Sequence, residues 1–145
     1  MPIKNYTTEV PAYRSIQEIY AALRAHGATD VQYAYEVGTI RVAALRFRLI
    51  IDGQQVPFSL PVAWQRFQRV LEQQGVSRWR DDAYVYRVAW RNIRDWVMAQ
   101  LALYDTLIVD LPQVFLPFAT DRQGRTLYEQ VQAGRFFLED GSHHA

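Results

Sequence analysis

The chain has 145 residues, half of them hydrophobic and 21% charged, and it contains no cysteine. This composition predicts a single globular domain over residues 1–145 and excludes a disulfide framework, thiolate catalysis and Cys-ligated metal or iron–sulfur sites. Sixteen basic and fifteen acidic residues give a net charge of +1, so no strong overall field attracts nucleic acid and any anion site must come from local clustering.

Nothing in the sequence predicts contact with a membrane. No stretch approaches the roughly 18 consecutive apolar residues of a membrane span, and the first ten residues lack the apolar core of a secretory signal. We therefore expect a soluble, cytoplasmic protein without a membrane partner. The tail 141–145 is expected to be frayed, and His143 and His144 within it are either native or a cloning remnant.

The first predicted element is an amphipathic helix over about residues 16–26. Ser15 and Glu18 match the capping-box pattern, in which a hydroxyl and a carboxylate satisfy free amides at a helix start. Apolar residues then follow at helical spacing, and Gly27 supplies the stop.

Three strands are predicted next. Val31–Val37 and Ile40–Ile51 have the alternation of strands, and Asp52–Gly53 is a hairpin turn signal because glycine tolerates positive φ. Gln54–Leu60 then runs back. Because Pro57 interrupts a ladder at a central position, we expect this third strand to be an edge strand or to carry a bulge.

Two helices follow the strands. Residues 62–74 carry an apolar stripe that ends at Gly75, and Pro61 is expected in the first helical turn, where its missing amide costs nothing. Asp81 and Asp82 are expected to cap a third, longer helix with an apolar ridge that extends to Tyr104.

Two short helices are predicted near the C-terminus. Asp110-Leu111-Pro112 begins the first, which Pro117 ends, and Thr126 and Glu129 form a capping box for the second, over about residues 127–133. The element order predicts an α+β fold: a three-stranded antiparallel meander packed against an N-terminal helix and a long central helix, with further short C-terminal helices. Because 14% of the residues are aromatic, we also expect a pocket or a subunit contact, and hence a homo-oligomer.

No motif of a nucleotide-binding loop or a nucleophile elbow is present. His26 is expected to cap a helix C-terminus rather than bind a metal, and capping explains the Asp81–Asp82 pair. We therefore expect no cofactor, no metal site and no catalytic residue. An enzyme stays open only through carboxylates that pair in space, which spacing cannot reveal.

Arginine is the candidate functional residue type, with fifteen Arg against one Lys, although a GC-rich genome explains the bias equally well. Arg87, Arg91 and Arg94 share one face of the third helix, with Trp90 beside them as an aromatic platform for bases. The alternative is a solvated face on which Arg91 pairs with Asp95.

Two further clusters of arginine are candidates for anion binding. Alternation places Arg46 and Arg48 on one face of the second strand, the open face of the sheet, with Gln32, Ala34 or Glu36 of the neighbouring strand, while the apolar residues face the helices. Arg122 and Arg125 lie in a turn just before a helix N-terminus, a favourable position for an anion. The alternative is again that these arginines lie on a solvated surface and bind no anion.

Three stretches resemble a group of small uncharacterised proteins carried by bacterial phages and prophages. They are Lys4-Asn5-Tyr6-Thr7-Thr8, the run from Tyr86 to Leu101, and Phe115-Leu116-Pro117-Phe118 followed by Gly124-Arg125-Thr126-Leu127-Tyr128-Glu129. The resemblance brings no activity with it. It implies a function that serves the mobile element, either handling its nucleic acid or interfering with a host defence. It also implies localisation in the cytoplasm of the host cell.

The leading hypothesis is a non-catalytic binding protein of this phage type that holds nucleic acid or another polyanion through its arginine and aromatic surface. The alternative is an oligomeric binder of a phosphorylated, nucleotide-like small molecule or of a host protein, for example a counter-defence factor. The arrangement of the arginines in space decides between these hypotheses and an ordinary solvated surface. Arginines that converge without carboxylate partners indicate an anion site, whereas arginines that are each paired with a nearby Asp or Glu form surface ion pairs, which contribute little.

Overall fold

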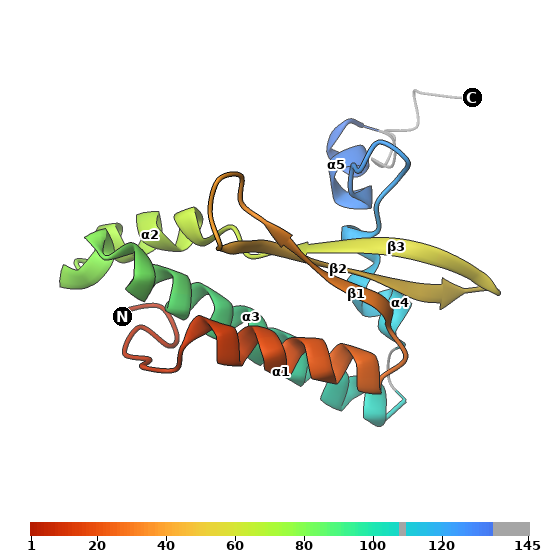
Figure 1. Cartoon of the computed structure of the whole chain (residues 1–145), viewed down its shortest axis with the longest axis horizontal. Coiled ribbons are helices and arrows are strands. Elements are labelled where there is room, and N and C mark those ends of the chain that lie inside the picture. Colours follow the sequence, from red (N-terminus) through yellow and green to blue (C-terminus); the bar gives the residue numbers. More distant parts are fainter. Residues whose placement is uncertain (108–109, 135–145) are drawn as a thin grey trace, which may run out of the picture.

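The computed structural model describes residues 1–107 and 110–134, and its elements form two layers (Figure 1). Helices α1 (Ala12–Ala25) and α3 (Asp82–Asp105) lie side by side under an antiparallel sheet with the strand order β1 (Thr29–Tyr35), β2 (Val42–Ile51), β3 (Gln54–Pro61). The short helix α5 (Leu127–Gln132) lies on the other side of the sheet. The predicted α+β fold is confirmed.

Helix α1 begins one turn earlier than the sequence predicts. Pro11 stands at the N-cap with φ near −60°, the value its ring imposes in any case, and Ala12 is the first helical residue. Ser15 is therefore an interior, fully buried residue whose hydroxyl caps nothing. The predicted capping box is wrong, and Glu18 instead extends toward α3.

The C-terminal end of α1 is closed by His26, as expected. Its Nδ1 lies 2.8 Å from the carbonyl oxygen of Ala22, and its Nε2 lies 3.1 Å from Oδ1 of Asp105 on α3. The imidazole therefore joins the ends of the two helices. Within residues 1–107 and 110–134, no group of three or more His, Cys, Asp or Glu is placed to hold a metal ion.

The β2–β3 hairpin forms at the predicted turn. Asp52 and Gly53 both have positive φ, 49° and 80°, which is the conformation of a two-residue turn whose twist matches that of the strands. The turn fixes the register, so that Arg46 lies opposite Ser59 and Arg48 opposite Pro57. Strand β3 is an edge strand, as Pro57 predicts.

The entry into helix α2 (Trp64–Gln73) differs from the prediction. Pro61 is the last residue of β3, paired with Ala44, and does not occupy the first helical turn. The chain reverses at Ala63, which has a left-handed φ of 46° at the helix N-cap. The helix therefore starts at Trp64, whose buried ring anchors it to the core.

Helix α3 follows a short 3-10 helix, η1 (Ser77–Arg80), and is capped as predicted, because Oδ1 of Asp81 accepts a hydrogen bond from the Tyr84 amide. It runs for 24 residues. No helix in the part of the chain that the structure describes is long and apolar enough to cross a membrane.

The C-terminal part crosses the edge of the sheet at β3. Helix α4 (Leu111–Phe115) continues into η2 (Leu116–Phe118), so the helical turns extend past Pro117, the predicted end. The amide of Thr120 then donates to the carbonyl of Pro57 at 2.9 Å. Both α4 and α5 have capping boxes, the second at Thr126 and Glu129 as predicted. The tail 141–145 and its two histidines lie outside the described residues.

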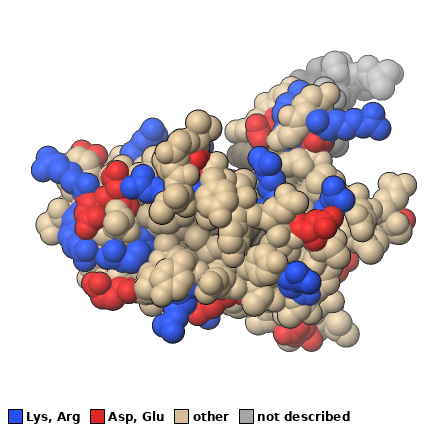
Figure 2. All heavy atoms as spheres, in the orientation of Figure 1, with Lys and Arg blue, Asp and Glu red and all other residues tan. Residues whose placement is uncertain are grey.

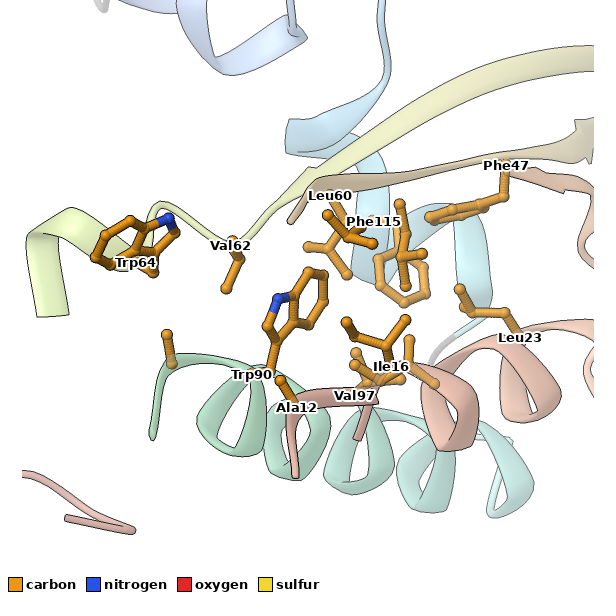
Figure 3. Close-up of a cluster of buried hydrophobic side chains, with 14 of the residues drawn as sticks. Ala12, Ile16, Leu23, Phe47, Leu60, Val62, Trp64, Trp90, Val97 and Phe115 are labelled. Carbon is orange, nitrogen blue, oxygen red and sulfur yellow. The ribbon is translucent and has the colours of Figure 1, made fainter. Parts of the chain in front are cut away.

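The core fills the space between the sheet and the two long helices (Figure 3). Phe47 and Phe58 stack with ring centroids 5.5 Å apart, and Phe115 of α4 meets Phe47 edge-on at 5.3 Å. Trp90 projects from α3 toward the sheet. The apolar face of β2 is thus covered by helices, and the face that carries Arg46 and Arg48 is open, as alternation predicts.

Candidate anion-binding cleft

The arginine stripe of α3 is enclosed by its neighbours. From Tyr84 to Met98 the helix has no exposed residue, because α1, α2 and the N-terminal segment pack around it. Arg91 Nη1 and Arg94 Nε both donate to Oε2 of Glu18, at 3.0 and 2.7 Å. The arginines predicted to bind an outside anion are therefore engaged by a carboxylate from α1.

Arg94 and Arg87 have further carboxylate neighbours, although Nε of Arg87 is buried without a hydrogen-bond partner among the described residues. Arg94 Nη1 lies 3.1 Å from Oδ1 of Asp95, and Lys4 Nζ and Asn5 Nδ2 reach Oδ2 of the same carboxylate at 3.1 and 2.9 Å. Arg87 makes a longer contact of 3.8 Å with Glu9. The predicted pairing of Arg91 with Asp95 does not occur, since Arg91 turns to Glu18 instead.

The pKa values of the two central carboxyls follow from this pairing. Burial acts to raise the pKa of Glu18, but the hydrogen bond and charge of Arg94, together with those of Arg91, outweigh it and lower the pKa. Asp95 behaves alike: hydrogen bonds from Asn5, Lys4 and Arg94 outweigh burial, and its pKa is lowered. The network joins α1, α3 and the N-terminal segment.

Trp90 does not provide the predicted platform for bases. Its side chain is fully buried in the core, so its ring faces cannot stack on a base from outside. Tyr84 is buried too, and its hydroxyl donates to the carbonyl of Tyr6. A helix packed on several sides turns its largest aromatic residues inward, and the aromatic side chains beside the arginines belong to the core.

The sheet arginines have a different environment. Gln32, Arg46 and Ser59 form a row across the three strands, since residues directly opposite in an antiparallel ladder share a face. Arg46 is exposed. Arg48, two residues along β2, lies on the same face and pairs with Asp30 of β1 at 3.1 Å.

A hydrogen-bonded turn at Asp121–Arg125 lies beside this row. Oδ1 of Asp121 accepts hydrogen bonds from the amides of Gln123 and Arg125, at 2.9 and 3.0 Å, and Oδ2 pairs with Arg125 Nε at 3.1 Å. Burial acts to raise the pKa of Asp121, but these amides and the Arg125 guanidinium outweigh it and lower the pKa. The turn is closed by Gly124, at a φ of 78°, and it presents Arg122.

The sheet row and the turn enclose a cleft of about 360 Å³. Figure 2 shows Lys and Arg atoms both over the sheet and on the C-terminal part beside it, with acidic atoms among them. The cleft thus joins two of the three arginine clusters singled out in the sequence. Its lining consists of Asp30, Gln32, Arg46, Phe47, Arg48, Pro57, Phe58, Ser59, Thr120, Asp121, Arg122 and Gly124.

Two guanidinium groups of the cleft are left without a carboxylate. Asp30 pairs with Arg48, and Asp121 pairs with Arg125, which lies just outside the lining. Over residues 1–107 and 110–134, Arg46 and Arg122 form no ion pair. Their charge is available to an anion, and the amide of Gln32 and the hydroxyl of Ser59 offer neutral donors beside it, whereas the hydroxyl of Thr120 donates to the carbonyl of Pro57.

A larger hollow of about 650 Å³ lies between the start of α2 and α5, but it has no comparable surplus of charge. Its lining contains one cation, Arg66, and one carboxylate, Glu129, and is otherwise neutral. The smaller cleft is therefore the better candidate for an anion.

Sequence reasoning did not find Ser59, Thr120 or Asp30 as cleft residues. A signal existed for Ser59, because a two-residue turn at Asp52–Gly53 places it opposite Arg46. None existed for Thr120, which approaches β3 through contacts between residues 63 positions apart.

Comparison of the chain with protein-family models, with curated proteins and with solved structures found no match. The assignment of a function to this cleft consequently rests on its own geometry and charge.

Proposed function

We propose that the protein is a non-catalytic binding protein that holds phosphate groups of a nucleic acid in the sheet-face cleft. The observation that carries the proposal is that Arg46 and Arg122, from elements far apart in the chain, open onto one hollow without a carboxylate partner among the described residues. A guanidinium fork matches the geometry of phosphate oxygens, and charge-assisted hydrogen bonds are the strong ones.

The proposal concerns binding alone. The carboxylates in the lining, Asp30 and Asp121, are each paired with an arginine. We also propose that the bound nucleic acid belongs to a mobile element, as the resemblance to phage and prophage proteins implies.

A labelled single-stranded oligonucleotide, titrated at several salt concentrations, tests this function. We expect binding at low salt that weakens with a slope of log K against log salt of about −1.4, since each phosphate contact on a single strand contributes about −0.7. Replacing Arg46 with Gln should weaken binding about tenfold, the effect of one lost charge-assisted contact.

Arg14→Gln is the matched control, because Arg14 is exposed on α1, on the other side of the sheet, and forms no ion pair within the described part of the chain. It makes the same change in net charge and should leave the affinity unchanged. Absence of binding at low salt, or equal losses in Arg14→Gln and Arg46→Gln, would contradict the proposal.

Self-association is a second candidate function, and strand β1 favours it. In the described structure β1 is an edge strand whose outer side pairs with no other strand, and Tyr33 and Tyr35 are exposed along it. An exposed edge is a template for pairing with another chain, and tyrosine is enriched in interfaces. The proposed partner is a second copy of this chain.

Sedimentation velocity over a range of protein concentrations tests this second candidate. We expect a dimer that Tyr35→Lys converts to monomer, because a lysine on an edge strand opposes pairing. Tyr128→Lys is the control, since Tyr128 and Tyr35 have the same exposed fraction, 57%. A wild-type protein that stays monomeric at every concentration would eliminate this candidate.

A further inference from the structure

The surplus charge of the cleft corresponds to a doubly charged anion. After the pairs Arg48–Asp30 and Arg125–Asp121 are set aside, two guanidinium groups of the lining, those of Arg46 and Arg122, have no carboxylate partner in the described part of the chain. A phosphate monoester carries about −1.5 to −2 charges at neutral pH, whereas each phosphodiester of a strand carries one. A single monoester therefore neutralises the cleft, which one internal phosphate of a strand does not.

The carboxylates also limit what can pass through the cleft. Asp30 approaches from β1 and Asp121 from the turn beyond β3, so an acidic group stands on each side of the hollow across the strand direction. In one direction along the strands, the same face of the sheet continues toward Ala34, Ala44 and Pro61, which bring no cation. A backbone that continued across the strands would meet the ion pairs Arg48–Asp30 and Arg125–Asp121, and one that continued along the strands in this direction would meet neutral surface.

The size of the hollow agrees with a short occupant. Its volume of about 360 Å³ lies near the lower end of the range for small-molecule sites, roughly 300 to 1,000 Å³. This accommodates a ligand of nucleotide size and not an extended track of several nucleotides.

We infer that the cleft takes a phosphate monoester carried on a nucleoside: Arg46 and Arg122 hold the phosphate, while Ser59 and Gln32 donate to its oxygens. The inference rests on the proposed function and narrows its ligand from the phosphates of a strand in general to a terminal one. Two sources supply this chemistry, the phosphorylated end of a single strand and a free mononucleotide.

The test compares one oligonucleotide sequence in four forms: with a 5′-phosphate, with a 3′-phosphate, with hydroxyl ends, and closed into a circle. Adenosine monophosphate and adenosine are titrated alongside. We expect a form with a terminal phosphate to bind at least about tenfold more tightly than the hydroxyl and circular forms, the effect of one charge-assisted contact. Adenosine monophosphate should compete, and adenosine should not.

The arms separate the two sources. Equal affinity for adenosine monophosphate and for the phosphorylated strand would assign the site to a free nucleotide, and much tighter binding of the strand would assign it to a strand end. In either case Arg46→Gln and Arg122→Gln should each remove most of the preference for the monoester, while Arg14→Gln keeps it. Thermal unfolding of each variant checks that the fold is retained.

Two outcomes overturn the inference and differ in what they leave standing. If all four oligonucleotides bind equally and Arg46→Gln weakens them all, the protein binds strands through internal phosphates, and only the proposed function survives. If neither the oligonucleotides nor adenosine monophosphate bind, both fall.

Discussion

Replacing Trp90 with alanine is expected to destabilise the protein by about 3–5 kcal/mol, the usual cost of removing a large aromatic side chain from a core. Trp90 is fully buried, and it projects from α3 into the space between Leu60, Val62 and the rest of the helical layer (Figure 3). Its ring meets that of Tyr86 edge-on, with centroids 6.4 Å apart. The surrounding strands and helices cannot collapse far enough to fill the cavity.

Urea denaturation measures this loss, and Trp79→Ala is the comparison. Trp79 lies in η1, is only half-buried, and its ring is covered on one side by Arg80 at 4.7 Å, so its removal should cost clearly less. A platform for bases would behave in the opposite way, because Trp90→Ala would then reduce oligonucleotide affinity with little change in stability. That result would show that α3 is a binding surface.

Replacing Glu18 with glutamine is expected to cost about 1–2 kcal/mol at neutral pH, between the values for exposed and for buried ion pairs. One oxygen of Glu18 accepts from both Arg91 and Arg94, whose side chains are 20% and 28% exposed. Without the carboxylate, two partly buried guanidinium groups lose their shared counter-charge. Glu72→Gln on α2 is the control, because Glu72 is exposed and forms no ion pair in the described structure.

The cost of Glu18→Gln should depend on pH. Because the pKa of Glu18 is lower in the folded protein than its ordinary value of 4.5, the unfolded chain takes up a proton first as the pH falls. The stabilisation is thus fully present above 4.5 and is lost as the pH falls through the lower, folded-state value. The pKa of Asp95 is also lowered in the folded protein, from its ordinary value of 3.8, so the stabilisation from this carboxylate is likewise lost as the pH falls.

The urea midpoints of wild type and Glu18→Gln should therefore differ at about pH 7 and lie closer together at about pH 3, because protonation of Glu18 removes the charge that glutamine lacks. Wild type and Glu72→Gln should have similar midpoints at both values. If the difference in urea midpoint between wild type and Glu18→Gln stays the same in acid, the glutamine disturbs packing rather than charge. The ion pairs of Glu18 with Arg91 and Arg94 then do not stabilise the contact between α1 and α3.

Local chemistry accounts for the parts of the fold that the sequence predicts correctly. The hairpin at Asp52–Gly53, the cap at Asp81 and the capping box at Thr126 each depend on a few adjacent residues, and all three are present. Where two local solutions compete, the prediction is wrong: Ser15 matches a capping box, but Pro11 already starts the helix a turn earlier.

The open face of the sheet was likewise accessible from the sequence. Alternation alone places Arg46 and Arg48 opposite the apolar face of β2, and the hairpin register adds Ser59. Spacing along a helix also places Arg87, Arg91 and Arg94 together, but it says nothing about which partner faces them. Glu18, 73 residues before Arg91, faces that stripe and engages Arg91 and Arg94.

The sequence by itself determined the order of elements, most of the turns and caps, and the side of each strand on which arginine lies, because these depend on short-range backbone and side-chain preferences. Only the tertiary structure decided which arginines keep their charge available. Arg91 and Arg94 pair with a carboxylate from α1, whereas Arg46 and Arg122, 76 residues apart in the chain, line one cleft and form no ion pair within the described residues. Electrostatic surplus is a property of neighbours in space, and no pattern along the chain encodes it.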